Sequence, residues 1–241
     1  MQTHILLLQA RHADDAARHE ERTSFARAAG VAETQIIPFD LLTEKLTLAT
    51  VRRYDVLMVG GSGDYYVSKG NLPNFQVVLD VLGEVITVGQ PIFASCFGFQ
   101  LIVKALGGEI TYAPAYTEVG TFPVTLTETG RSDALFGALP HTFRAQLGRK
   151  DRATRLPDSL LHLAGSENAP FQAIRVPDQP IWATQFHPEL TKGTNLARFR
   201  RYLDGYAATM SAEALEATQR QFDHSPEANQ LIRRFMQIVF G

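Results

Sequence analysis

Cys96 is the residue of this sequence best placed for covalent chemistry. An apolar run over residues 91–95 leads directly into it, and small residues stand two positions to either side, Ala94 and Gly98. This spacing predicts a sharp turn from a strand into a helix, which exposes the sulfur where the helix dipole favours a thiolate. The backbone N–H of Phe97 would then be free to donate to an oxyanion. Residue type alone favours a buried structural cysteine, but the turn favours a nucleophile.

A histidine and a glutamate stand further along the chain, in the run Gln185-Phe186-His187-Pro188-Glu189. A lone histidine at the end of a strand is more often a structural group than a base. Here the imidazole can take the thiol proton and later return it to a leaving amine, while the glutamate orients the ring and supports its positive charge. The sequence therefore predicts a catalytic triad of Cys96, His187 and Glu189.

A glycine-rich turn follows another apolar run, in Leu57-Met58-Val59-Gly60-Gly61-Ser62-Gly63-Asp64. Glycines at such a turn let backbone N–H groups approach a ligand closely. The turn is not a nucleotide-binding P-loop, because no Gly-Lys-Ser/Thr sequence follows it. By itself this turn is equally compatible with an ordinary surface loop.

These three clusters, in this order, resemble the class I glutamine amidotransferase family, and the resemblance extends over nearly the whole chain. Within the family the chain looks closest to the stand-alone branch similar to the amidotransferase domain of GMP synthase. The resemblance implies hydrolysis of the glutamine side-chain amide through a γ-glutamyl thioester, ammonia release to an acceptor enzyme, and no metal or organic cofactor. It also implies residue roles: Cys96 as nucleophile, His187 as base, Glu189 as its orienting partner, Gly61 and Phe97 as oxyanion donors, and Gln100 as a contact to bound glutamine.

Arg149 is the main departure from the family pattern, because it stands where the family often shows a histidine. An arginine there can bind a second carboxylate, as on a γ-glutamyl peptide, or be a solvated surface charge, which is the commoner case. Family members deliver ammonia to a synthase domain, and this sequence contains none. Three hypotheses remain open: a glutaminase that serves a synthase partner subunit, a γ-glutamyl peptide hydrolase acting on glutathione-like substrates, and a non-catalytic binding or regulatory homologue.

The elements that must position these residues alternate along the first hundred positions. Strands are predicted at residues 4–9, 35–39, 55–59 and 91–95, and helices at residues 14–29 and 74–88. The alternation predicts an α/β fold with a mostly parallel, open, flavodoxin-like sheet and helices on both faces. After residue 108 the pattern becomes strand-like, at residues 121–127, 143–147, 161–164, 171–176 and 181–186, which would extend the sheet or form a small antiparallel flap.

A helical C-terminal extension, about residues 194–241, completes the single domain predicted for residues 1–241. Its first helix has an apolar face made of Leu196, Phe199, Leu203 and Tyr206. Three arginines lie off that face and are predicted to be solvated: Arg198, Arg200 and Arg201. The run Ser225-Pro226-Glu227 provides the N-cap and first-turn signals of a last helix.

Composition narrows the choice of partners to small molecules and proteins. The chain has 23 Lys+Arg against 25 Asp+Glu, a formal net charge of −2, so binding to nucleic acid is not expected. Its apolar runs are far shorter than the roughly 20 residues of a membrane span, and the first residues lack the features of a signal peptide. We therefore expect a cytoplasmic protein with no membrane contact. A single cysteine excludes an internal disulfide and a cysteine-rich zinc site.

Overall fold

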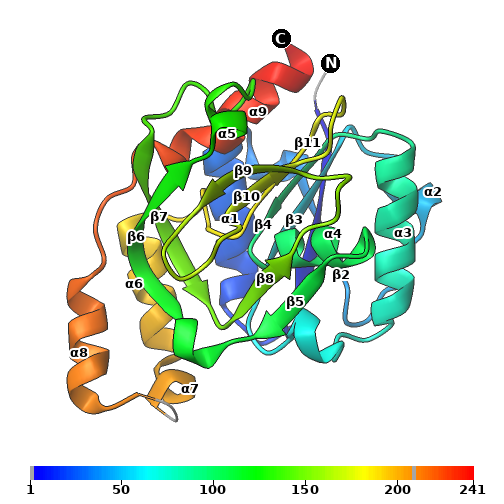
Figure 1. The fold of residues 1–241 in the computed structure, drawn as a ribbon. Helices are drawn as coiled ribbons and strands as arrows, with labels where there is room; N and C mark the ends of the chain where they lie inside the picture. The colour runs from blue at the N-terminus through cyan, green and yellow to red at the C-terminus, as the bar shows by residue number, and fades with distance from the viewer. Residues whose placement is uncertain (1–2, 208–209) are drawn as a thin grey trace.

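The computed structural model describes residues 3–207 and 210–241, so the extreme amino terminus and two positions of the predicted C-terminal extension lie outside it. A parallel half-sheet forms its centre (Figure 1). The strands lie in the order β2 (Ile36–Asp40), β1 (Ile5–Ala10), β3 (Val56–Ser62), β4 (Ile92–Ser95) and β11 (Ile181–Thr184). Each of the five overlaps a predicted strand. The carboxyl ends of these parallel strands meet at one edge of the sheet.

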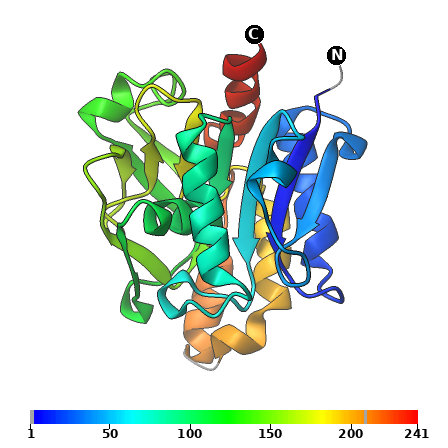
Figure 2. The same cartoon turned by 90° about the vertical axis from the view of Figure 1, so that its right-hand side faces the viewer.

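Helices cover both faces of this half-sheet. The helices are α1 (Ala17–Ala29), α2 (Leu48–Val51), α3 (Phe75–Thr87), α4 (Phe97–Ala105) and, near the C-terminus, α9 (Leu231–Phe240). Figure 2 shows α3, in teal, in front of the sheet. Every residue of β1 is buried, and its side chains alternate between two cores, with Leu6 and Leu8 on the α3–α4 side and Ile5 and Leu7 on the α1–α9 side. The predicted α/β fold is confirmed.

The remaining strands form both of the arrangements that were predicted as alternatives. Four antiparallel strands extend the main sheet beyond β11: β10 (Ala173–Arg175), β9 (Leu161–Gly165), β6 (Glu118–Leu126) and β7 (Thr142–Arg149). A separate two-stranded sheet pairs β5 (Glu109–Tyr112) with β8 (Asp151–Arg155), neither of which was predicted. Glu109 and Tyr112 are exposed, so β5 lacks the apolar alternation by which strands are recognised.

Three helices from the C-terminal part lie at the bottom of Figure 2, in yellow-orange and orange. They are α6 (Lys192–Arg201), α7 (Leu203–Ala207) and α8 (Ala212–Arg220), and a four-residue helix, α5 (Glu128–Arg131), lies elsewhere on the antiparallel half. The predicted apolar face packs into one small cluster with Val119 and Phe222, although the helix breaks at Tyr202. Helices α6 and α7 therefore lie at the carboxyl edge where Cys96 and His187 are expected, whereas α8 packs against β6.

Two predictions for the C-terminal segment are wrong. The Ser225 hydroxyl does not cap the last helix, because it accepts from Gln146 and donates to Asn229, and the helix begins with a short 3-10 turn at Ala228. The arginine run is not uniformly solvated either: Arg200 and Arg201 are exposed, whereas Arg198 is buried.

Candidate active site

Cys96 lies at the turn between β4 and α4, as its small neighbours predict. Its backbone has φ 52° and ψ −101°, a conformation that is rare for a residue with a side chain and that stores strain. The Cys96 N–H donates to Thr184 O of β11 at 2.8 Å, which ties the turn to the adjacent strand. Gly98 is required by packing, since a Cβ there would lie 2.7 Å from both Cβ and O of Val59. Because residue 98 is glycine, helix α4 can approach β3 closely, and the Cys96 sulfur lies at the carboxyl edge of the sheet.

His187 and Glu189 follow the end of β11, the strand next to β4, so the topology brings them to the same edge as Cys96. His187 Nδ1 lies 2.6 Å from Glu189 Oε1, and both side chains are buried. The backbone around them is fixed by two side chains: Asn229 donates to the carbonyls on either side of Glu189, and Arg27 donates to Glu189 O at 2.9 Å. The predicted histidine–glutamate pair is thus held in a defined orientation.

The electrostatics of this pair favour a proton on the imidazole. Burial by itself lowers the pKa of His187, but Glu189 and a hydrogen bond with Cys96 raise that pKa to about 9. Burial also works against ionisation of Glu189, and the contact with His187 holds the pKa of this carboxyl below its usual value. An imidazolium is therefore the favoured form near neutral pH, next to the cysteine and ready to donate a proton.

The two predicted oxyanion donors differ in their availability. Phe97 is the first residue of α4, so its N–H has no acceptor within the helix, and the residue lines the cavity beside Cys96. Gly61 was expected to offer a free N–H, and this expectation is wrong for the structure, because that N–H donates to Glu21 Oε1 at 3.0 Å. The neighbours of Gly61 towards the cavity, Ser62 and Gly63, do line it.

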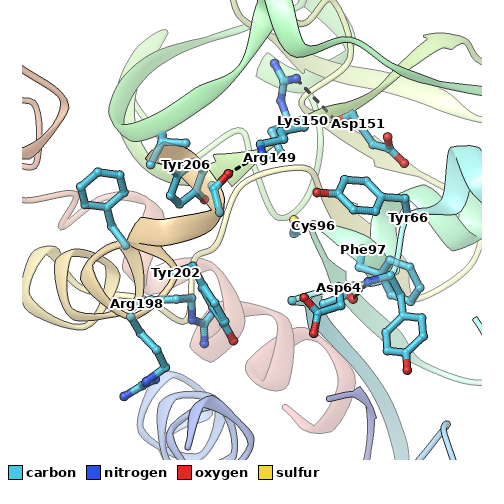
Figure 3. Close-up of a pocket in the computed structure, with 18 of the residues that line it drawn as sticks. Asp64, Tyr66, Cys96, Phe97, Arg149, Lys150, Asp151, Arg198, Tyr202 and Tyr206 are labelled. Carbon is cyan, nitrogen blue, oxygen red and sulfur yellow. Dashed lines mark hydrogen bonds between the residues drawn. The ribbon is translucent and has the colours of Figure 1, made fainter. Parts of the chain in front are cut away.

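A cavity of about 390 Å³ opens at this site, within the range of small-molecule pockets. Figure 3 shows the Cys96 sulfur between Tyr66 on one side and Tyr202 and Tyr206 on the other. Gln100, predicted to contact substrate, lines the cavity from α4. Its Nε2 already donates to Asp151 O at 3.3 Å and Gln185 Oε1 at 3.2 Å, so only its carbonyl end remains for a ligand.

Arg149 also lines the cavity, yet both of its predicted roles need correction. It is not a solvated charge, because its side chain is buried. Nor is its charge free for a substrate carboxylate, since Arg149 Nη2 donates to Glu118 Oε2 in a buried ion pair. Glu118 in turn accepts from Ser166 Oγ at 2.8 Å and Gln172 Nε2 at 2.9 Å. This network locks Arg149 into the wall of the cavity.

The sequence reading missed the residues that α6, α7 and the end of β1 contribute to the cavity. Asn195 and Arg198 of α6 and the C-cap residue Tyr202 are spaced three and four residues apart and therefore lie on one side of the helix, and all three line the cavity. Arg11 directly follows β1 at the carboxyl edge of the sheet and also lines the cavity. The sequence contained a signal for each group. The three helix residues form a polar stripe beside the apolar face, and Arg11 is a charged residue directly after a strand of a parallel sheet, where ligand sites lie.

Neither a metal centre nor a membrane span is found in the described part of the chain. Across residues 3–207 and 210–241, no three His, Cys, Asp or Glu side chains are grouped so that they could hold a metal ion. Within the same ranges no helix is both long and apolar enough to cross a bilayer.

A strained cysteine at a strand–helix turn, beside a histidine–glutamate pair at the edge of an α/β sheet, is an arrangement that nucleophilic catalysis can use. A more particular assignment comes from the family model described as "Glutamine amidotransferase class-I", which matches residues 23–201, well over half of the chain. The chain belongs to the class I glutamine amidotransferase family. Membership supports an amide hydrolase acting on glutamine in general terms.

Individual relatives agree with this family assignment. The chain is 28% identical over 165 residues to the "GMP synthase [glutamine-hydrolyzing]" of Lactococcus lactis subsp. cremoris (strain SK11), covering 66% of this chain and 30% of that protein. It thus spans less than a third of the length of this relative. Two solved structures share its fold. A glutamine amidotransferase from Thermotoga maritima has a TM-score of 0.72 at 19% identity, covering all of both chains. A glutamine amidotransferase from Methylobacillus flagellatus has a TM-score of 0.71 at 17% identity, covering 98% and 93%.

Proposed function

We propose that this chain hydrolyses the side-chain amide of glutamine through a thioester on Cys96 and releases ammonia for an acceptor enzyme. One observation carries the proposal: in a member of this family, a strained cysteine stands beside a buried imidazole whose Nδ1 is 2.6 Å from a glutamate oxygen. That arrangement suits a step in which the Cys96 thiolate attacks a carbonyl carbon and the His187 imidazolium then protonates the leaving group.

In the proposed steps, Cys96 forms and breaks the covalent bond to the substrate, and His187 transfers the protons. The Cys96 thiolate attacks the γ-carbonyl carbon of glutamine and forms a carbon–sulfur bond. The carbon–nitrogen bond then breaks, and ammonia leaves with the proton that His187 donates. His187 next takes a proton from water, which attacks the thioester, so that glutamate leaves and the thiolate is restored. Glu189 holds the ring and supports its charge in both halves.

The oxyanion of each tetrahedral intermediate needs donors at the cavity wall. Phe97 N–H suits this role because it stands at the first turn of α4 without an intrahelical acceptor. In the proposal, Gly61 contributes only after its N–H leaves Glu21, the acceptor that holds it in the structure. Losing one oxyanion donor costs about 3 kcal/mol in acyl-transfer chemistry. A free N–H at Gly61 would therefore raise the rate of hydrolysis.

The acceptor enzyme is proposed from the relatives. The Lactococcus protein is named a glutamine-hydrolysing GMP synthase, and this chain matches under a third of its length. We therefore propose that a synthase unit outside these 241 residues carries out the ammonia-consuming step. The alternative of a γ-glutamyl peptide hydrolase loses the support that Arg149 gave it, because Glu118 neutralises Arg149.

The deciding experiment is glutamate release from glutamine and from glutathione by the purified protein, with Cys96→Ala as the blank. The proposal expects cysteine-dependent release from glutamine. Release from glutathione alone would replace it with the peptidase function. Silence on both substrates, together with slow alkylation of Cys96 by iodoacetamide, would instead identify a non-catalytic homologue, since an active site requires a reactive thiol.

A further inference from the structure

Arg198 is an isolated buried cation at the edge of the cavity. Only 8% of its surface is exposed, and the residue lines the cavity from α6 together with Tyr202 (Figure 3). Within the described residues, none of its three guanidinium nitrogens, Nε, Nη1 and Nη2, has a hydrogen-bond partner. Leaving a buried charged donor without partners is costly, so this arrangement calls for an anion that the chain itself does not supply.

The neighbouring charges have partners of their own and do not neutralise Arg198. Arg11 Nη2 lies 3.2 Å from Glu21 Oε1, and Arg11 Nη1 lies 3.4 Å from Asp15 Oδ2. The Tyr202 hydroxyl donates to Asp15 Oδ2 at 2.6 Å. Glu189 is taken by His187. Burial and the nearby Arg11 lower the pKa of Arg198, but a guanidinium remains charged throughout the physiological range.

Arg149 provides an internal comparison, because it lines the same cavity and is equally buried. Its Nη2 donates to Glu118, which two further side chains also contact. Arg198 has the same charge and planar fork of donors, but no carboxylate among the described residues is within hydrogen-bonding distance of it. A planar fork fits a carboxylate with two parallel hydrogen bonds.

From this geometry we infer that Arg198 is a carboxylate-binding residue of the cavity and holds a carboxylate group of the γ-glutamyl substrate whose amide lies at Cys96. This inference rests on the proposed function, since it assigns the substrate carboxylate of the same site. Two carboxylates share the required chemistry: the α-carboxylate of glutamine itself, and the distal carboxylate of a γ-glutamyl peptide.

A competing role for Arg198 is structural support of the triad. Glu189 Oε2 also lacks a hydrogen-bond partner among the described residues, and Arg198 is close enough to lower the pKa of Glu189. A water between the two groups would make Arg198 a positioning residue for Glu189. If Arg198 supports the triad, its replacement should lower activity on every substrate equally. If Arg198 binds a carboxylate, its replacement should not lower activity on a substrate that lacks that carboxylate.

The test measures kcat and KM of the wild type, Arg198→Met, Arg198→Lys and Arg200→Met. The Arg200 variant is the matched control, because Arg200 lies on the same helix but is exposed. The substrates are glutamine, glutamine with its α-carboxylate amidated, γ-glutamylglycine, and γ-glutamylglycine with its terminal carboxylate amidated. Arg198→Lys keeps the positive charge, so it tests the role of Arg198 even if the Met variant does not fold.

We expect Arg198→Met to lose about 10- to 100-fold in kcat/KM, mostly through KM, on every substrate that carries the carboxylate held by Arg198, as for a lost charged hydrogen bond. Arg198→Lys should recover part of this loss, and Arg200→Met should match the wild type. If Arg198 holds the α-carboxylate, the loss should be absent only on α-amidated glutamine. If Arg198 holds the distal carboxylate, the loss should appear only on γ-glutamylglycine. An equal loss on all four substrates, or no loss on any, would overturn the inference.

A second readout needs no turnover and so separates this inference from the proposed function. Cys96 is the only cysteine of the sequence, so alkylation reports on this site alone. The ratio of alkylation rates by iodoacetate and iodoacetamide should fall in Arg198→Met and stay unchanged in Arg200→Met, even if the protein releases no glutamate. A ratio that is equal in all variants would contradict a carboxylate site at Arg198.

Discussion

The cavity has two walls that are built on different principles. The sheet-edge wall presents Cys96, Phe97 and His187 from turns that the backbone of adjacent strands holds in place. The helical wall presents Arg198 and Tyr202 as long side chains from α6, and its arginine has no partner among the described residues. Rigid turns suit bond-making chemistry, and an unpaired buried charge suits recognition of a ligand. We therefore propose that the site has a reacting side at the sheet edge and a binding side on the helices.

The sharpest way to break this division is Cys96→Ala, which removes the nucleophile and leaves the helical wall intact. We expect glutamate release to fall by at least about 10³-fold, because the thioester cannot form. Binding of glutamine, measured by calorimetry, should remain within a few-fold of the wild type. Loss of binding along with turnover would show that the two walls do not act separately.

The two buried arginines of the cavity give the next largest effect, this time on stability. Arg149→Met leaves Glu118 buried without its cation, so the free energy of unfolding should fall by about 3–5 kcal/mol. Arg198→Met removes a guanidinium that has no hydrogen-bond partner among the described residues, and the free energy of unfolding should stay within about 1 kcal/mol of the wild type or rise. Urea denaturation of both variants measures the difference, and equal losses would show that Arg198 has a partner in solution.

The difference between the walls also explains how much the sequence could predict. Cys96, His187 and Glu189 each follow a short apolar strand, so local patterns locate them and the parallel topology brings them together. The state of Gly61 could not be predicted, because its N–H is taken by Glu21, forty positions away in α1. Arg198 was read as a surface charge because its burial depends on how α6 lies against the sheet edge, which no local pattern encodes.

The protonation of His187 gives a pH-dependent test of the reacting side. Its raised pKa predicts that turnover falls as pH rises through about 9, because the imidazole then lacks the proton for the leaving ammonia. By the same linkage, the stabilisation from this charged group is fully present below about 6.5 and is lost as pH rises through about 9.

Glu189→Gln sharpens this test, because it removes the carboxylate that raises the pKa of His187. The alkaline limb of the rate profile should move to lower pH, and the rate at neutral pH should fall by about 10²-fold. Wild-type and variant profiles over pH 6 to 10 measure both effects. An unmoved alkaline limb would mean that a group other than His187 controls it.

The smallest expected effect concerns the packing that sets the sheet-edge wall. Gly98→Ala would place a Cβ 2.7 Å from Val59 O, so α4 must shift away from β3 at a cost of about 1–3 kcal/mol of stability. Gly83→Ala in α3 is the matched control, since nothing lies within 4 Å of its Cβ and alanine should raise stability by up to about 1 kcal/mol. Because a shift of α4 moves Cys96 and Phe97 but not α6, Gly98→Ala should lower kcat more than it raises KM. A loss confined to KM would mean that α4 also positions the binding side, and the two walls would then share one support.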